Sequence, residues 1–324
     1  MFGGGAGGGR KCESGDEKDL PRADAGKVAG VEFMDSMKLT KLVIAVDMDG
    51  TMLFADNRFH PLDVAFLKQE LPLTVIFATG RSLTGMRLPL TINGLIGESE
   101  PVPYPLVLHN GALVYLPGQR VHRHFAFEPG IAAELVQRVL AFPQDLAVVA
   151  QGEGREWLIR TSPYGGPRAI IYGYRPLPWQ PGKALPVFSK LLCISDQPEV
   201  LKELEETLRS LPLEGNSSLG DLYEMTPKGV TKATGLNALL PALGVEDVPL
   251  ITVGDGENDF TMLDMADLAC APANAHPPLK THAQFIFDRS ERGIFQPVLE
   301  AAMERLPLPE AVQGQLRAVM VTSG

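Results

Sequence analysis

Apolar residues recur along the chain in two alternating patterns from residue 41 onward. Short runs of β-branched and aliphatic residues predict buried strands, and apolar residues spaced three or four apart predict helices. Strands are predicted at 42–46, 73–78, 106–108, 250–253 and 284–287, and helices at 61–70, 230–243, 258–265 and 295–306. Strands that alternate with helices predict an α/β fold, a Rossmann-like doubly wound sheet of mostly parallel strands with helices on both faces.

The segment between the two halves of this pattern, at 127–220, has a different order of predicted helices and strands. The features there are a helix at 129–142, alternating strands at 146–160, a stretch rich in Gly, Pro and Tyr at 162–186, a strand at 187–194 and a charged helix at 199–211. We therefore predict a separate α+β module inserted at 127–220. The parallel domain is then built from 41–126 and 221–310, and 311–324 forms a C-terminal tail.

The first 40 residues are rich in glycine and charge and contain few apolar side chains. Such a segment cannot bury enough apolar surface to offset the entropy that it would lose on ordering. We predict that residues 1–40 form a disordered tail.

Composition and charge exclude several classes of protein. The formal net charge of −10 argues against nucleic-acid binding, because no basic stripe is present to contact phosphates. No apolar run reaches the roughly 18 residues that a membrane span needs, and the N-terminal residues lack the apolar core of a secretion signal. Three widely separated cysteines form neither a zinc motif nor a disulfide framework, as expected of a cytoplasmic protein. A small anionic substrate is compatible with this charge, because it needs only a local positive site.

The polar residues that could carry chemistry follow the predicted strands. Four strand ends carry the sequences DMDGT (47–51), TGR (79–81), NG (110–111) and GDGEND (254–259). In open parallel sheets, ligands bind at the carboxyl edge of the strands. Loops from neighbouring strands would therefore form one composite site.

The first of these clusters holds two aspartates two positions apart. Residues with this spacing in an extended chain face the same side, so Asp47 and Asp49 can address one ligand. Two close carboxylates repel each other, which raises a pKa or requires a cation. One could act as nucleophile and the other as acid or base. A plain turn would also use Asp and Gly, but this cluster directly follows a buried strand, which favours a site.

The second acidic cluster offers oxygen ligands only. Asp255, Glu257, Asn258 and Asp259 follow a strand, with no histidine or cysteine beside them. Ligands of this kind suit a hard cation such as Mg²⁺. Helix capping is the alternative explanation for acidic residues at this position.

A phosphoryl group would also need positive charge near these carboxylates. Lys228 and Lys232 lie at the start of the helix predicted at 230–243. A lysine there opposes the helix dipole unless an anion is bound nearby. From the residues alone, a solvated surface role remains open for either lysine.

Together these segments resemble the haloacid dehalogenase superfamily of phosphatases. The sequences DMDGT, ATGR, PKGVTK and GDGENDFTML occur in the order of that family, and the resemblance covers about 41–306. The insertion between ATGR and PKGVTK resembles a type IIB cap, and LHNGALVY resembles a strand of Cof-type sugar-phosphate phosphatases. The resemblance implies a Mg²⁺-dependent phosphomonoesterase that forms an aspartyl-phosphate and acts on a small phosphorylated metabolite such as a sugar phosphate.

Under this resemblance each motif residue has an expected role. Asp47 is expected as nucleophile, and Asp49 as general acid and then base. Lys232 is expected to balance the charge on nucleophile and phosphoryl group, and Thr79 to bind the phosphate. The expected metal ligands and their supports are Asp47, Asp49 (through its backbone carbonyl), Asp255, Asn258 and Asp259. Further contacts to phosphate or substrate are expected from Met48, Gly50, Thr51, Gly80, Arg81, Asn110 and Asn258.

Two positions depart from the family pattern. Ala233 stands where a glycine usually follows the motif lysine. Pro272 stands where a methionine usually precedes the Asn-Ala pair at 274–275. Small backbone shifts are expected at both positions, and neither is a proposed catalytic group.

The cap contains cationic and aromatic residues that could face the site: Arg155, Trp157, Arg160, Tyr164, Tyr172, Tyr174, Arg175 and Lys183. Packing within the cap is the alternative for each of them, so the sequence does not define the substrate. A phosphomutase of the phosphomannomutase type and a non-catalytic protein that binds phosphorylated metabolites are the alternative functions. We expect a monomer or a weak homodimer.

Overall fold

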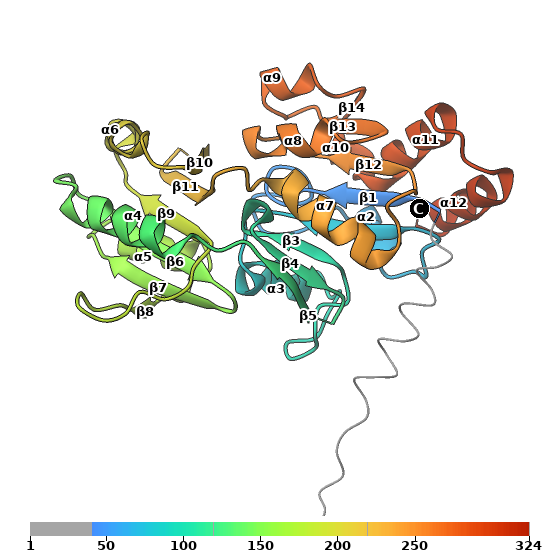
Figure 1. The fold of residues 1–324 in the computed structure, drawn as a ribbon. Coiled ribbons are helices and arrows are strands. Elements are labelled where there is room, and N and C mark those ends of the chain that lie inside the picture. Colours follow the sequence, from blue (N-terminus) through green and yellow to red (C-terminus); the bar gives the residue numbers. More distant parts are fainter. Residues whose placement is uncertain (1–40, 119, 219, 324) are drawn as a thin grey trace, which may run out of the picture.

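The computed structural model describes residues 41–118, 120–218 and 220–323, which form two adjoining parts (Figure 1). The larger part is a sheet between layers of helices, and the smaller part runs from α4 to β11. The disordered tail predicted at 1–40 lies outside the described residues. Within the described ranges, no helix is both long and apolar enough to cross a bilayer.

Eight strands form the larger sheet in the order β14-β13-β12-β1-β2-β3-β4-β5. They are β1 (Val43–Val46), β2 (Thr74–Ala78), β3 (Leu106–Leu108), β4 (Leu113–Leu116), β5 (Arg120–His124), β12 (Leu250–Val253), β13 (Leu268–Pro272) and β14 (Phe285–Phe287). Strands β14 to β3 are parallel, and β4 and β5 add an antiparallel hairpin. Strand β1 lies between β2 and β12 and is buried throughout, as its uninterrupted apolar sequence predicts.

Helices cover both faces of this sheet, which confirms the doubly wound α/β prediction. One face packs Ile44 and Val46 against α2, α3, α11 and α12, and the other packs Val43 and Ala45 against α7, α8 and α9. Successive strand residues point to opposite faces, so each strand contributes to both cores. The helices are α2 (Pro61–Leu67), α3 (Leu83–Ile92), α7 (Lys232–Leu243), α8 (Phe260–Leu263), α9 (Pro277–Lys280), α10 (Arg289–Arg292), α11 (Phe295–Arg305) and α12 (Glu310–Ser323).

The smaller part is an α+β cap on a six-stranded sheet in the order β10-β11-β9-β6-β7-β8. Its elements are α4 (Pro129–Ala141), β6 (Ala147–Gly152), β7 (Arg155–Arg160), α5 (Gly165–Ile171), β8 (Leu177–Pro178), β9 (Lys190–Ile194), α6 (Pro198–Leu208), β10 (Leu213–Ser218) and β11 (Leu222–Pro227). Helices α4 and α6 cover one face, and α5 covers part of the other. Strand alternation places Lys190 and Glu224 on this second face, where the cap meets the core.

Two predicted boundaries differ from the structure. Strand β11, expected in the core, pairs with β9 and β10 and completes the cap sheet, so the cap extends to Pro227 rather than to residue 220. A C-terminal tail was expected at 311–324, but its described residues, 311–323, belong to helix α12. Its apolar residues at 312, 316, 319 and 320 pack on the core with helical spacing, so the sequence did contain the signal.

Candidate active site

Four loops meet at the carboxyl edge of the larger sheet. Asp47 follows β1, Thr79 follows β2, Asn110 lies just after β3 and Asp255 follows β12. These strands are neighbours, so their loops converge. The ladder continues into this edge, because Asp47 N donates to Val253 O at 2.9 Å. The structure therefore brings together the strand ends that the sequence singled out.

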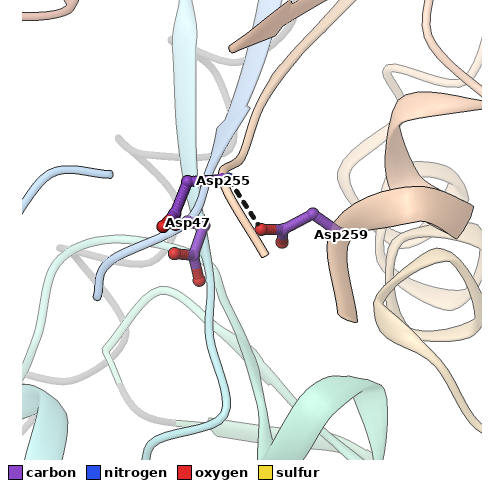
Figure 2. A group of neighbouring side chains, drawn as sticks. All are labelled: Asp47, Asp255 and Asp259. Carbon is purple, nitrogen blue, oxygen red and sulfur yellow. Dashed lines mark hydrogen bonds between the residues drawn. The ribbon is translucent and has the colours of Figure 1, made fainter. Parts of the chain in front are cut away.

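Three carboxylates and one ammonium group form the centre of this edge. Oxygens of Asp47, Asp255 and Asp259 all lie within 4.8 Å of one another (Figure 2). Lys232 Nζ donates to Asp47 Oδ1 at 2.5 Å and to Asp259 Oδ1 at 2.6 Å. Asp47, Asp259 and Lys232 are buried. We refer to these four residues as the acidic centre.

Burial and repulsion between carboxylates raise the pKa values of two aspartates in the acidic centre, Asp47 and Asp255. Burial raises the pKa of Asp47 well above its usual range, and Asp259 and Asp255 raise it further against the opposing effect of Lys232. Burial and Asp259 raise the pKa of Asp255 to about 6. Burial alone would lower the pKa of Lys232, but Asp259 and Asp47 outweigh it and hold that pKa above its ordinary value. Because one ammonium group faces three carboxylates, a further cation would stabilise their ionised forms.

The residues after Asp47 hold Asp255 close to it. Thr51 Oγ1 donates to Asp255 Oδ1 at 2.8 Å. Gly50 has a φ of +79°, and a Cβ there would lie 2.1 Å from Asp255 Oδ2, so both the backbone angle and the space require glycine. Asn274 Nδ2 donates to Gly50 O at 2.8 Å. The Asn-Ala loop therefore supports this turn although a proline replaces the family methionine before it.

Helix α7 begins at Lys232 and is capped by Thr231. Thr231 N donates to Thr234 Oγ1 at 3.2 Å, and Thr234 N donates to Thr231 Oγ1 at 3.5 Å. A lysine at a helix N-terminus is unfavourable unless anions surround it, and two buried carboxylates do so here. Ala233 lies in the first turn and leaves the capping box intact. Lys228 is exposed on the approach to this helix.

Asp49 lies outside the acidic centre and pairs with Arg81. Arg81 donates from Nε to Asp49 Oδ2 at 2.7 Å and from Nη2 to Asp49 Oδ1 at 2.6 Å. The Asp49 side chain is 45% exposed, so solvent reaches it. Arg81 thus fixes the second aspartate in a bidentate fork, and its expected contact with phosphate or substrate stays a prediction.

Two other predicted positions have buried side chains. Met48 packs in the core of the larger part, which leaves its backbone for contacts at the site. Thr79 is fully buried, and its Oγ1 accepts from Arg81 N at 3.2 Å. The threonine therefore shapes the loop that carries Gly80 and Arg81.

The turn after β3 has an unusual backbone. His109 and Asn110 have φ of 52° and 54°, in a left-handed region that disfavours residues with a Cβ. Backbone hydrogen bonds hold the turn, from His109 N to Arg81 O at 3.2 Å and from Asn110 N to Thr79 O at 3.1 Å. A Cβ at the following glycine would lie 1.8 Å from the Thr231 carbonyl oxygen. The turn thus presses the Asn110 loop against the start of α7.

Two cap residues that the sequence analysis did not single out reach the core loops. Lys190 is fully buried and donates to Gly80 O at 2.6 Å and to Glu224 Oε1 at 2.6 Å. Asn110 Nδ2 donates to Glu224 Oε2 at 2.8 Å, and Asn110 Oδ1 accepts from Asn258 Nδ2 at 3.0 Å. This chain of hydrogen bonds connects the cap with the loops after β2, β3 and β12.

Several of the cap residues considered from the sequence are used inside the cap. Arg160 donates to the carbonyl oxygens of Val139, Phe142 and Gln144. Tyr164 and Tyr172 donate to Asp221. Tyr174 differs, because it is buried and lies close enough to Glu224, Asp49 and Arg81 for their charges to act on its hydroxyl, whose pKa is raised mainly by burial.

A cavity of about 310 Å³ lies between strands β10 and β11 of the cap and the core loops. Its lining includes Asn110, Lys232 and Asn258 from the core and Glu214 and Glu224 from the cap. Because Lys232 is itself part of the acidic centre, the cavity adjoins that centre.

Fold and site together define a class of protein: hydrolases that move phosphoryl groups at the edge of a doubly wound sheet beneath an inserted cap. Residues 44–296 match the model of the haloacid dehalogenase-like hydrolases, and the chain belongs to that family. Within it the chain is a Cof-like phosphatase, as the motif resemblance predicted.

Similar proteins carry several names. The phosphoglycolate phosphatase of Methanopyrus kandleri is 27% identical over 255 residues, which cover 77% of this chain and 91% of that protein. A chloroplastic endoribonuclease YBEY of Arabidopsis thaliana is 28% identical over 271 residues, 75% of this chain but 43% of that protein. A solved sugar phosphatase of haloacid dehalogenase subclass IIB has a TM-score of 0.62 at 19% identity, over 81% of this chain and 97% of that one. This likeness shows a shared fold.

Proposed function

We propose that this phosphatase hydrolyses phosphomonoesters of small metabolites, such as sugar phosphates, through an aspartyl-phosphate on Asp47 and with Mg²⁺ at the acidic centre. The observation that carries the proposal is the contact of Lys232 with both Asp47 and Asp259 inside a buried group of carboxylates. An ammonium group held against the nucleophile would balance the negative charge that an arriving phosphoryl group brings.

The residues present fit Mg²⁺. The acidic centre offers only carboxylate oxygens as ligands, which are the ligands that Mg²⁺ prefers. Both oxygens of Asp259 already accept hydrogen bonds, from Lys232 and from the backbone N–H groups of Asp255 and Gly256. We therefore assign direct metal binding to Asp47 and Asp255, with the Asp49 carbonyl, and a supporting role to Asp259. Bound Mg²⁺ would neutralise charge on the phosphoryl oxygens.

The proposed reaction has two steps. In the first, an Asp47 oxygen attacks phosphorus while the ester oxygen leaves and takes a proton from Asp49. In the second, Asp49 accepts a proton from water as that water attacks phosphorus, which releases inorganic phosphate and restores the Asp47 carboxylate. The fork from Arg81 holds both Asp49 oxygens in place for these proton transfers. Lys232 stays on the nucleophile throughout.

Rapid quench with acetyl phosphate labelled with ³²P on its phosphoryl group tests the covalent step. Asp47→Asn removes the nucleophile and is expected to show neither label nor turnover. Asp49→Asn keeps the nucleophile, and acetate leaves without a proton, so label is expected to accumulate. Label on the Asp47→Asn protein would show that the nucleophile lies elsewhere.

The same experiment addresses the remaining alternative. Membership in a family of hydrolases supports an enzyme over the non-catalytic alternative. A phosphomutase would pass the label from the enzyme to an added sugar phosphate faster than to water. We expect the label to appear as inorganic phosphate whether or not a sugar phosphate is present.

We also propose that this activity is cytoplasmic and that the protein is a monomer or a weak homodimer. Cys193 and Cys270 are free and buried, as is usual in a reducing compartment. Light scattering after size exclusion would measure the mass directly, and a stable higher oligomer would contradict this expectation.

A further inference from the structure

We propose that the cavity beside the acidic centre selects phosphomonoesters whose leaving group is neutral or positively charged, and excludes those that carry a second anionic group. This inference deepens the phosphatase function proposed above and rests on it. It names the chemical class of the substrate by charge.

The position of the cavity makes it the space for the leaving group. Its core side includes Lys232, which contacts the proposed nucleophile, and Asn110 and Asn258, which are linked by a hydrogen bond of 3.0 Å. Its cap side is formed by β10 and β11. A volume of about 310 Å³ lies at the small end of the range for ligand pockets, which suits a small metabolite.

Three carboxylates line this space. Glu214 and Glu224 come from the cap, and Glu257 comes from the 3₁₀ turn after β12. Among the described lining residues Lys232 is the one lysine or arginine, and it already contacts two aspartates of the acidic centre. Lys190 lies behind Glu224 and balances the negative charge of that carboxylate, but it does not contact Glu214 or Glu257. Glu214 accepts from a neutral backbone N–H, and Glu257 has only a long contact with His276 Nδ1 at 3.9 Å, so both negative charges can act on whatever enters the cavity.

Two of these three carboxylates are also held in place. Asn110 and Lys190 fix both oxygens of Glu224 at 2.8 Å and 2.6 Å. Gly229 N donates to Glu214 Oε1 at 2.7 Å. Fixed acceptors suit hydroxyl and ammonium donors, whereas a carboxylate or second phosphate on the leaving group would be repelled. The rest of the polar lining is hydroxyl and amide groups from Asn216, Thr226, Thr231 and Thr261.

A series of three small phosphomonoesters separates charge from size. Phosphoglycolate, glycerol phosphate and phosphoethanolamine have leaving groups that are negative, neutral and positive, respectively. We expect kcat/KM for phosphoglycolate to be at least about tenfold below that of the other two, the scale of one charge–charge repulsion near a protein surface. Each compound is also measured as a competitive inhibitor of acetyl phosphate hydrolysis, so that a compound that is not turned over still reports its affinity.

Matched variants assign the effect to the cavity. The double variant Glu214→Gln/Glu257→Gln removes two lining charges and keeps the side-chain shape. It is expected to narrow the ratio between phosphoethanolamine and phosphoglycolate by about tenfold. Glu246→Gln removes the same charge at an exposed position beyond the C-terminal end of α7, about 18 Å along the helix from Lys232, and is expected to leave the ratio unchanged.

The outcomes separate this inference from the function on which it rests. Equal kcat/KM and equal inhibition for the three esters, or a preference for phosphoglycolate, would overturn the charge selection. Hydrolysis of acetyl phosphate in the same preparation would still support the proposed phosphatase function. A ratio that stays unchanged in the double variant would overturn the assignment to these carboxylates. Failure to release phosphate from any compound, acetyl phosphate included, would overturn the proposed function and this inference with it.

Discussion

Lys232 carries a full positive charge in the interior, at the first position of a helix and in contact with two carboxylates. Neither the helix dipole nor burial favours a lysine at this position, so its stability there depends on its partners. The same partners are the groups that a phosphoryl transfer would use. At this residue, structural and chemical requirements coincide.

Replacing this lysine should affect catalysis far more than replacing its neighbour in the sequence. Lys232→Ala leaves Asp47 without its charge partner and is expected to lower kcat by about 10²–10³, the scale for losing one group that stabilises charge in a transition state. Lys228→Ala is the matched control, because Lys228 is exposed, and kcat is expected to stay within a few-fold. Steady-state kinetics at saturating Mg²⁺, with circular dichroism to verify folding, measure both. The reverse pattern would move the motif lysine to 228.

Removal of metal should abolish activity. The acidic centre has three carboxylates and one ammonium group, so it needs a further cation to bind an anionic substrate. Phosphate release is expected to vanish in EDTA and to return with Mg²⁺. Ca²⁺, which prefers more ligands and longer distances, is expected to restore little activity. Full activity in a preparation shown to be free of metal would contradict the magnesium assignment.

The acidic residues could be placed from the sequence because they directly follow apolar strands, and parallel strands end at one edge. Asp47 and Asp255 therefore come together wherever β1 and β12 are neighbours. Lys190 and Glu224 could not be placed in this way. Each lies in a cap strand, and its proximity to the core loops depends on how the cap docks, which leaves no local pattern. The available signal was weak: Lys190 begins the otherwise apolar strand β9, and Glu224 lies inside the mixed strand β11.

Among the elements, α2 and α11 are joined by one buried carboxylate. Asp63 on α2 accepts from Ile294 N at 2.9 Å and from Phe295 N at 3.1 Å, at the start of α11. The helix N-terminus favours a negative group there, whereas burial opposes it. Burial prevails over these hydrogen bonds and raises the pKa of Asp63 to about 7.

This pKa predicts how stability depends on pH. An unfolded aspartate has a pKa of about 3.9, so between pH 4 and 7 the folded protein binds the proton more tightly and its stability falls as pH rises. Asp63→Asn still accepts the hydrogen bonds but cannot ionise. The unfolding free energy of wild type minus that of Asp63→Asn should therefore fall by about 2 kcal/mol from pH 5 to pH 7 and level off above pH 7. Urea titrations at several pH values measure it, and a difference independent of pH would contradict the raised pKa.

Several elements with clear apolar periodicity were predicted closely, although α12, whose apolar spacing is also helical, was predicted as a tail. The strand predicted at 42–46 is β1 (Val43–Val46), and the helix predicted at 295–306 is α11 (Phe295–Arg305). Strand β11 has the mixed sequence LYEMTP, whose polar residues serve the interface between cap and core. Its polarity comes from where it packs rather than from its own secondary structure, so periodicity alone did not reveal it.

At the scale of the whole molecule, cap and core meet through a buried ion pair. Lys190 and Glu224 both belong to the cap sheet, and each also contacts the core, at Gly80 and Asn110 respectively. A buried pair adds little net stability by itself, but loss of one partner leaves the other charged and without compensation. The pair should therefore be sensitive to single changes and tolerant of a paired change.

Comparison of a single variant with the paired variant tests this sensitivity. Lys190→Met is expected to lower the unfolding free energy by about 3–5 kcal/mol, because Glu224 is left buried without its cation. Lys190→Met/Glu224→Gln removes both charges, keeps an acceptor for Asn110, and is expected to recover most of the loss. Both tryptophans, Trp157 and Trp179, lie in the cap, so fluorescence during urea unfolding reports on this part. Equal losses in the single and double variants would show that the charges are not coupled.

The division into a doubly wound core and an inserted α+β cap was predictable because the periodicity of apolar residues changes twice along the chain. The docking of the two parts was not, since it rests on polar contacts between residues far apart in sequence, such as Asn110 with Glu224. Such contacts depend on shape and on desolvation of both surfaces. They become visible only once the two sheets are placed together.

The central position of β1 in the sheet has a consequence for folding during synthesis on the ribosome. Its partner β2 emerges soon after it, but Val43 pairs with Leu250 of β12 on its other side. About 200 residues lie between them, so at about 5–20 residues per second the second partner follows some 10–40 s later. The cap can fold during that interval, because its sheet is complete within its own segment. Until β12 is synthesised, one edge of β1 has no strand to pair with. We expect the nascent chain to need a chaperone most while this edge is unpaired.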